Sequence, residues 1–321
     1  MSPDGRVAAA PHAAGRTEAL RAVERAAALL GPLARRDEPV ATRTTYRVGG
    51  HAALFAEITD EASLERVAAA AAASGVEVLV LGRGSNLLVA DAGFAGLCVA
   101  LAGEFERIEI DRAGARIVAG GGASYPVLAR RAAGAGCAGM EWAVGIPGSV
   151  GGAVAMNAGG HGAETGDRLS SCRIVDLEHG GDRVVAAAEL ALGYRRSRVG
   201  PGDLVVSATF AGEAGDPEAS AKAIAEIVAW RREHQPGGRN AGSVFTNPAS
   251  DSAGRLVEAA GLKGLRIGSA QVSEKHANFV QADAGGSADD VYKLVATLRR
   301  LVAERLGVEL RTELRLVGFA P

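Results

Sequence analysis

The chain alternates between segments with helical periodicity and segments with strand periodicity. Apolar residues at i, i+3 and i+4 spacing predict helices over 17–30, 61–74, 125–133, 217–233, 253–260 and 288–306. Short β-branched or alternating runs predict strands over 76–81, 96–101, 106–111, 116–119, 171–178, 183–185, 203–211, 266–269 and 278–281. The chain closes on an alternating strand, 308–317, with leucines and valines on one face and Glu309, Arg311, Glu313 and Arg315 on the other. The chain is therefore predicted to contain both helices and strands along its whole length.

Breaks in the pattern predict the domain organisation. Residues 1–16 combine proline, glycine, alanine and scattered charge, which is typical of a disordered tail. The turn signal Gly215-Asp216-Pro217 marks a boundary, after which helices and strands begin anew. We therefore expect one domain over 17–213, a second over 214–307, and the closing strand in 308–321.

The segment 145–162 reads GIPGSVGGAVAMNAGGHG, and glycine is denser there than a helix or strand interior ordinarily tolerates. We expect a loop whose glycines let main-chain N–H groups approach a ligand without an intervening Cβ. A flexible surface loop is the alternative, but Val150, Val154 and Met156 are too apolar for a solvated linker. The preferred interpretation is a buried loop around a large, flat, partly anionic ligand.

A second glycine turn, Gly82-Arg83-Gly84-Ser85-Asn86, follows the predicted strand 76–81. A strand that enters such a turn presents N–H donors suited to phosphate, although no Walker A lysine follows. The chain also contains a literal G-x-G-x-x-G, at Gly134, Gly136 and Gly139. It follows a predicted helix instead of opening one after a strand, so we interpret it as a helix C-terminus rather than a dinucleotide fingerprint.

Composition narrows the function classes. With 321 residues, a net charge of −2 and 48% hydrophobic residues, the chain is globular, and its charge gives no support for nucleic-acid or membrane-surface binding. The three scattered cysteines, Cys98, Cys137 and Cys172, argue against disulfides and against a metal site, and we expect them in the core. No apolar run is long enough for a membrane helix or a signal peptide, so we expect a cytoplasmic protein.

Several motifs, in this order, resemble those of the UDP-N-acetylenolpyruvoylglucosamine reductases. They are L-G-x-G-S-N at 81–86, G-I-P-G-S-V-G-G-A-V-x-M-N-A-G at 145–159, G-Y-R at 193–195, A-G-S-x-F-x-N-P at 241–248, H-A-N-F at 276–279 and E-L-R-L-V-G at 313–318. Each motif alone is weak, whereas the ordered set is specific and covers nearly everything after residue 40. The family makes UDP-N-acetylmuramate for peptidoglycan, and the chain length resembles its shorter subtype.

The resemblance implies a fold, a cofactor and partners. It implies a two-lobed FAD-binding domain of the vanillyl-alcohol-oxidase type, with lobes of about 17–81 and 82–213, followed by an α+β substrate-binding domain. It implies non-covalent FAD, NADPH as hydride donor and UDP-N-acetylglucosamine enolpyruvate as substrate, in a monomer. The cofactor-binding residues that it implies are Gly82, Gly84, Ser85, Asn86, Gly145, Ile146, Gly148, Ser149, Val150, Gly152, Asn157 and Gly159.

The resemblance also assigns the chemistry to Arg195, Ser243 and Glu313. Flavin N5 delivers hydride to the vinyl CH2 carbon, Ser243 supplies the proton, and Arg195 and Glu313 stabilise the enolate charge on the carboxylate. Without the motifs, each residue has an ordinary explanation: a solvated arginine, a turn hydroxyl and a water-facing glutamate.

Contacts with the UDP-sugar are expected from Asn247 and His276, and more weakly from Tyr125 and Lys275. The chain departs from the family at Thr246, where lysine is frequent. Two alternatives stay open from the residues alone. One is another flavin oxidase of the same fold, and the other is a non-catalytic paralogue that binds flavin or a UDP-sugar.

Overall fold

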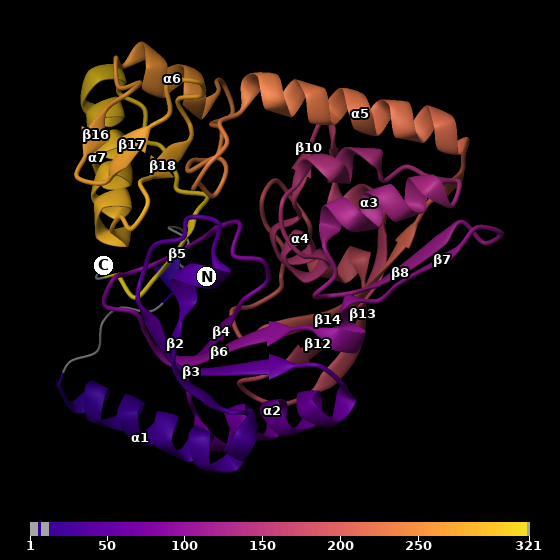
Figure 1. Cartoon of the computed structure of the whole chain (residues 1–321), viewed down its shortest axis with the longest axis vertical. Helices are drawn as coiled ribbons and strands as arrows, with labels where there is room; N and C mark the ends of the chain where they lie inside the picture. Colours follow the sequence, from indigo (N-terminus) through magenta and orange to yellow (C-terminus); the bar gives the residue numbers. More distant parts are fainter. Residues whose placement is uncertain (1–5, 8–12, 320–321) are drawn as a thin grey trace.

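The computed structural model describes residues 6–7 and 13–319. Figure 1 shows two lobes, each built on a β-sheet, and a smaller unit of helices and short strands beside them. The smaller unit is formed by the C-terminal part of the chain. A long helix, α5 (Pro217–His234), runs across the second lobe toward this unit.

The first lobe is a four-stranded sheet covered by two helices. Its strand order is β2-β3-β6-β4, antiparallel between β2 and β3 and parallel elsewhere. Leu54 and Val67 belong to the core between the sheet and the helices. Helix α2 ends as its sequence predicts, because Gly75 adopts a left-handed φ of 65°. The elements are α1 (Ala13–Leu30), β2 (Arg35–Pro39), β3 (His51–Ile58), α2 (Glu61–Ser74), β4 (Val78–Val80) and β6 (Phe94–Leu101).

The second lobe is a five-stranded antiparallel sheet of order β13-β12-β14-β8-β7. Strand β14 lies between two cores: Leu204 and Val206 face the first lobe, while Val205 and Phe210 face the helices of the second. The elements are β7 (Ile108–Asp111), β8 (Arg116–Gly120), α3 (Tyr125–Gly134), α4 (Val150–Met156), β12 (Leu169–Asp176), β13 (Asp182–Ala186) and β14 (Asp203–Ala211). Two short strand pairs accompany them: β9 (Cys137–Ala138) pairs with β15 (Glu213–Ala214), and β10 (Gly159–Gly160) pairs with β11 (Ala163–Glu164).

The C-terminal unit packs two helices, α6 (Ala253–Ala259) and α7 (Ala288–Leu306), on a small antiparallel sheet. That sheet consists of β16 (Arg266–Ile267), β17 (Ala270–Val272) and β18 (Val280–Ala282). Beyond α7 the chain returns to the first lobe, where β19 (Arg315–Val317) pairs in parallel with β5 (Leu87–Val89). This return brings the residues around Glu313 beside the turn that precedes β5.

Several predictions from the sequence are wrong at their edges. The predicted tail over 1–16 is too long, because α1 begins at Ala13 and β1 (Arg6–Val7) pairs with β19; residues 1–5 and 8–12 lie outside the described part. The predicted boundary at 214 places α5 in the second domain, yet Ile224 of α5 packs in the core of the second lobe. The predicted strand 308–317 is paired as a strand only over β19, because residues 308–314 meet neighbouring chain at isolated points such as Thr312 with Phe245.

The prediction of a loop throughout 145–162 is also wrong, because 150–156 form the short helix α4. Its glycines serve close packing: a Cβ on Gly151 would lie 3.1 Å from the carbonyl oxygen of Val205 in β14. Val150 and Val154 are fully buried, which excludes the surface-loop alternative. The G-x-G-x-x-G segment does lie at the end of a helix, α3, as predicted. All three cysteines are buried in the core, as predicted.

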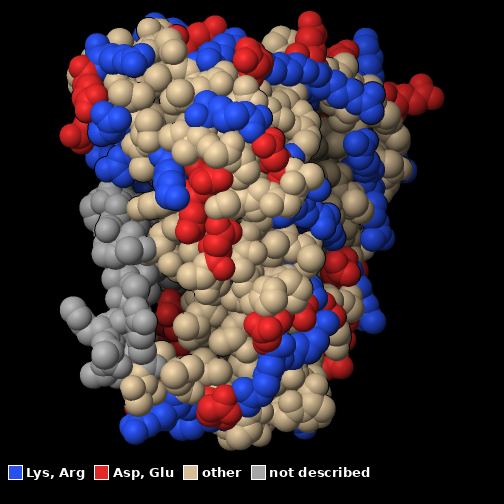
Figure 2. All heavy atoms as spheres, turned by 60° about the vertical axis from the view of Figure 1, so that its left-hand side comes forward, with Lys and Arg blue, Asp and Glu red and all other residues tan. Residues whose placement is uncertain are grey.

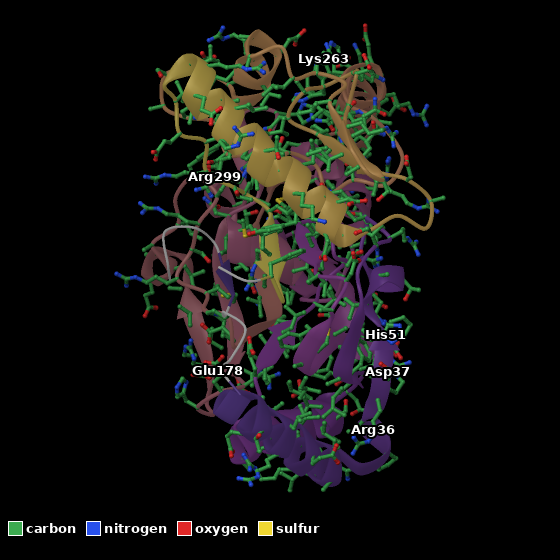
Figure 3. The ribbon with its side chains drawn as sticks, turned by 90° about the vertical axis from the view of Figure 1, so that its left-hand side faces the viewer. Arg36, Asp37, His51, Glu178, Lys263 and Arg299 are labelled. Carbon is green, nitrogen blue, oxygen red and sulfur yellow. The ribbon has the colours of Figure 1, made fainter. Side chains whose placement is uncertain are left out.

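Charged side chains link the elements at the surface. Arg173 of β12 contacts Glu61 of α2 at 2.5 Å and Asp182 of β13 at 2.6 Å, which joins the two lobes. Figure 3 shows Asp37 and His51 together at the outer edge of the first lobe, where their side chains lie 2.8 Å apart. Lys and Arg alternate with Asp and Glu over the face shown in Figure 2.

Within the described ranges, no helix is both long enough and apolar enough to cross a membrane.

Candidate active site

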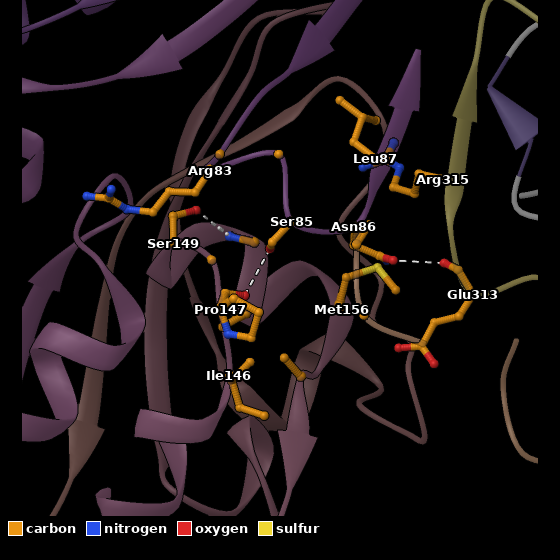
Figure 4. A pocket seen from close by; sticks show the side chains of 18 of the residues that line it. Arg83, Ser85, Asn86, Leu87, Ile146, Pro147, Ser149, Met156, Glu313 and Arg315 are labelled. Carbon is orange, nitrogen blue, oxygen red and sulfur yellow. Dashed lines mark hydrogen bonds between the residues drawn. The ribbon is translucent and has the colours of Figure 1, made fainter. Parts of the chain in front are cut away.

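A cavity of about 260 Å³ opens where the two lobes and the C-terminal unit meet (Figure 4). A second cavity of about 450 Å³ extends from it between the two lobes. Gly82, Ser149 and Arg315 line both, so the two cavities adjoin each other. We refer to the first as the catalytic cavity and to the second as the inner cavity.

One wall of this space is the turn from Gly82 to Asn86. Its run of backbone N–H groups has no hydrogen-bond acceptor in the part of the chain that the structure describes. Gly84 adopts a φ of 59°, and a Cβ there would lie 2.4 Å from the carbonyl oxygen of Arg43. The Ser85 hydroxyl donates to the carbonyl of Pro147 at 2.9 Å, and Asn86 Nδ2 donates to the carbonyl of Glu313 at 3.1 Å. The turn is therefore tied to the opposite wall and to the C-terminal segment.

The opposite wall runs from Gly145 to Gly152. Gly148 adopts a φ of 136°, and Ser149 begins α4 by accepting a hydrogen bond from the N–H of Gly152. A Cβ on Gly82 would lie 2.4 Å from the Ser149 hydroxyl oxygen, so the two walls approach each other where neither carries a bulky side chain. Gly145, Ile146, Gly148, Ser149, Gly152 and Gly159 all line the catalytic cavity, as do Gly82, Gly84, Ser85 and Asn86.

Arg195 reaches the catalytic cavity from a tight turn of the second lobe. It has a φ of 55°, which is uncommon for a residue with a side chain, and Gly193 and Arg196 close the turn with reciprocal backbone hydrogen bonds. Its Nη2 donates to the carbonyl of Gly159 at 2.7 Å, and its Nε lies 3.0 Å from Oε1 of Glu313. The guanidinium is thus fixed on two sides and is only 21% exposed.

Glu313 comes to the same cavity on the returning C-terminal segment. Its side chain is 16% exposed, so the expectation from strand alternation that it faces water is wrong. Burial raises the pKa of the Glu313 carboxyl, and the charge and hydrogen bond of Arg195 oppose that rise. The carboxyl is therefore easier to protonate than an exposed glutamate.

Ser243 lines the cavity from the C-terminal unit. Asn278, which is buried, holds the adjoining backbone: its Oδ1 accepts from the N–H of Phe245 at 3.0 Å and its Nδ2 donates to the Phe245 carbonyl at 2.8 Å. The N–H of Val244 donates to the Asn278 carbonyl at 2.9 Å. The H-A-N-F segment therefore positions the backbone next to Ser243.

Two residues predicted to contact the cofactor lie elsewhere. Val150 is fully buried in the core of the second lobe, and its N–H donates to the carbonyl of Ala123. Asn157 is also fully buried; its Nδ2 donates to the carbonyl of Gly193 at 3.1 Å and its Oδ1 accepts from the N–H of Gly166 at 2.8 Å. Its side chain therefore supports the turn that carries Arg195 instead of lining either cavity.

None of the four residues predicted to bind the UDP-sugar lines the catalytic cavity. Tyr125 is fully buried, with its hydroxyl 3.1 Å from the Thr165 hydroxyl oxygen. Asn247 is exposed and accepts from the N–H of Ala253, which fixes the approach to α6. The other two have partners of their own: His276 Nδ1 accepts from the N–H of Asn278 at 3.2 Å, and Lys275 Nζ donates to the carbonyl of Arg232. All four side chains therefore have partners within the protein, and their contact with a UDP-sugar stays a prediction.

The cavity also contains residues that the sequence analysis missed. Arg231 and Gln235 reach it from the end of α5, with Arg231 Nε donating to Gln235 Oε1 at 2.8 Å. Met156, Phe279 and Arg315 line it as well. The position of Arg315, two residues after Glu313, was the one signal available for it, and no motif identified Arg231 or Gln235.

The residues present fit a dinucleotide cofactor. The unpaired N–H groups of 82–86 are suited to a diphosphate, and the glycines leave a cradle that side chains would fill. In agreement, residues 52–184 match the family model described as FAD binding domain. The two-lobed part of the chain is thus an FAD-binding domain, and the protein is a flavoprotein.

Residues 234–317 match the model of the C-terminal domain of UDP-N-acetylenolpyruvoylglucosamine reductase. Curated reductases of that name from Rubrobacter xylanophilus and Acidiphilium cryptum are 43% and 46% identical to this chain, over 90% and 88% of it and 97% and 91% of their own lengths. The crystal structure of the reductase from Thermus caldophilus superposes with a TM-score of 0.76 at 36% identity, covering 88% of this chain and 99% of that one. The chain belongs to the UDP-N-acetylenolpyruvoylglucosamine reductase family.

Proposed function

We propose that this protein catalyses the NADPH-dependent reduction of UDP-N-acetylglucosamine enolpyruvate to UDP-N-acetylmuramate, a step in peptidoglycan precursor synthesis. The observation that carries the proposal is the convergence of Arg195, Ser243 and Glu313, from three separate segments, on one cavity beside the FAD cradle. When bound, FAD would supply the hydride-transfer chemistry, with NADPH as the hydride donor and the vinyl CH2 carbon of the substrate as the acceptor of hydride from N5.

The walls 82–86 and 145–152 would hold the cofactor. Both NADPH and the UDP-sugar are diphosphate-linked nucleotides, so one cavity that opens beside the flavin suits their alternate binding. The residues proposed to act on the substrate, Arg195, Ser243 and Glu313, belong to one chain, and we propose that the enzyme works as a monomer. NADPH and nucleotide-activated sugars are cytoplasmic compounds, and the proposal therefore places the enzyme in the cytoplasm.

Arg195 and Glu313 would act on the carboxylate of the substrate. Hydride addition to the vinyl carbon leaves negative charge delocalised onto that carboxylate, and a fixed guanidinium lowers the energy of the charged state. The contacts of Arg195 with Gly159 and Glu313 hold it without the need for reorganisation. Burial raises the pKa of Glu313, and a Glu313 that takes up a proton when the substrate binds would donate a hydrogen bond to this carboxylate.

Ser243 would deliver the proton to the carbon beside the carboxylate. A serine hydroxyl is a weak acid and therefore has to act in contact with a strongly basic enolate. The hydrogen bonds of Asn278 to the adjoining backbone supply the fixed placement that this requires.

Anaerobic stopped flow on Ser243→Ala tests this assignment, with Ser250→Ala, at an exposed serine of the same unit, as the matched control. We expect flavin reduction by NADPH to stay at the native rate in both variants. Reoxidation by the enolpyruvyl substrate should slow by orders of magnitude in Ser243→Ala alone. Equal slowing of both half-reactions would contradict the proton-donor role.

A further inference from the structure

Arg315 is a half-buried cation without a counter-charge. Its backbone N–H donates to the carbonyl of Asn86 at 3.1 Å, but its guanidinium has no hydrogen bond or ion pair among residues 6–7 and 13–319. Burial lowers the pKa of Arg315, and no neighbouring acid opposes that shift. An unpaired charge in such a place is costly unless a ligand supplies the partner.

The other arginines of the two cavities have partners. Arg195 lies 3.0 Å from Glu313, and Arg43 lies 2.9 Å from Glu38. Arg231 donates to Gln235 and Arg47 to the carbonyl of Thr42, while Arg83 lies 3.4 Å from Glu106. Among the described arginines that line the two cavities, Arg315 alone has a guanidinium with neither a hydrogen bond nor an ion pair, and it lines both cavities.

A dinucleotide that occupies both cavities passes the junction between them. If the ribityl arm of FAD lies at this junction, two edges of the isoalloxazine flank it, and only the N1–C2=O edge carries hydrogen-bond acceptors that suit a guanidinium. We infer that Arg315 faces N1–C2=O and stabilises the reduced flavin, and thereby raises its reduction potential. This inference rests on the bound FAD and, for the orientation of the ring, on the proposed function.

Charge balance explains why the effect depends on the redox state. A hydride from NADPH adds two electrons and one proton at N5, releases NADP⁺, and leaves one negative charge shared by N1 and O2. The oxidised ring is neutral, so Arg315 gains its counter-charge only on reduction. The diphosphate differs in this respect, because its charge is equal in both redox states and the free N–H groups of 82–86 already suit it.

The test compares the midpoint potential and the FAD dissociation constant of Arg315→Met with those of the native protein. Arg311→Met, which removes an exposed arginine from the same segment, controls for the loss of one charge. We expect Arg315→Met to favour the oxidised flavin by about tenfold, which is about 30 mV for a two-electron couple. Its FAD dissociation constant should stay within a few-fold of the native value, and Arg311→Met should change neither quantity.

Other outcomes overturn the inference. An unchanged or raised potential contradicts it, and weakened FAD binding at an unchanged potential would assign Arg315 to the diphosphate. Arg315→Gln serves as the second variant if Arg315→Met does not fold, and failure of both to take up FAD would also make Arg315 a cofactor-holding residue. Neither measurement uses NADPH or the UDP-sugar, so failure here is distinguishable from failure of the proposed reaction.

Discussion

Replacement of Asn157 by alanine should damage both stability and catalysis without a direct effect on FAD. The side chain is fully buried and joins two backbone groups, the carbonyl of Gly193 and the N–H of Gly166. Both groups lose their partner in Asn157→Ala, which costs about 1–3 kcal/mol for each. Residue 157 also has a φ of 41°, where alanine adds roughly 1 kcal/mol that asparagine largely avoids. The expected loss of unfolding free energy is therefore about 3–7 kcal/mol.

The assay is urea denaturation at saturating FAD, with Asn240→Ala as the matched control. Asn240 donates to carbonyls of its own loop and accepts from the N–H of Gly242, and it is only partly buried, so water can solvate these groups in its absence. Because Gly193 closes the turn that carries Arg195, Asn157→Ala should also slow flavin reoxidation by the enolpyruvyl substrate.

Two results would refute this reasoning. A loss of less than about 1 kcal/mol would mean that the two hydrogen bonds contribute little. A weakening of FAD binding by more than tenfold, with stability unchanged, would mean that Asn157 contacts the cofactor as the sequence predicted.

Three further variants test other parts of the site. Glu313→Gln should remove a pH dependence of the stability. The folded pKa of Glu313 is raised, so the contribution of Glu313 to native stability falls as pH rises from its unfolded pKa through its folded pKa. The urea midpoints of the native protein and the variant should therefore diverge over that pH range. Tyr125→Phe should cost about 1 kcal/mol, because its hydroxyl meets only Thr165, and should leave the KM for the UDP-sugar unchanged; a several-fold rise in KM in steady-state assays would show substrate contact. Gly84→Ala places a Cβ 2.4 Å from a backbone carbonyl oxygen and should weaken FAD binding by more than tenfold in titrations. Gly285→Ala, the control, is also at positive φ but has no atom within 4 Å of the added Cβ, and should bind FAD as the native protein does. Equal FAD affinity in both variants would contradict the proposal that the turn 82–86 holds FAD.

Much of the fold is predictable because local signals determine it. Helix α2 has Asp60 and Ser63 at its start and Gly75 at its end, and α7 has Ser287 and Gly307. The prediction of a loop over 145–162 was wrong because glycine is unfavourable in a helix, whereas the contact of α4 with β14 requires small residues there. That contact is tertiary and leaves no periodic trace in the sequence.

The site was predictable where motif and backbone chemistry agree. The 82–86 turn, Arg195, Ser243 and Glu313 all reach the cavity. Asparagine and tyrosine in a motif do not reveal whether they meet a ligand or a backbone carbonyl, and Asn157 and Tyr125 meet partners within the protein. Arg231 and Arg315 could not be recognised, since burial and the lack of an acidic partner are properties of the folded chain.

The central claim is that this chain passes a hydride from NADPH through FAD to the enolpyruvyl sugar. The most direct measurement is anaerobic stopped flow on the purified native protein, which follows the visible flavin absorbance as NADPH and then UDP-N-acetylglucosamine enolpyruvate are added. The account predicts bleaching by NADPH and rapid recovery on addition of the sugar. A protein that bleaches but recovers only with oxygen, or one that takes up no FAD, would contradict it.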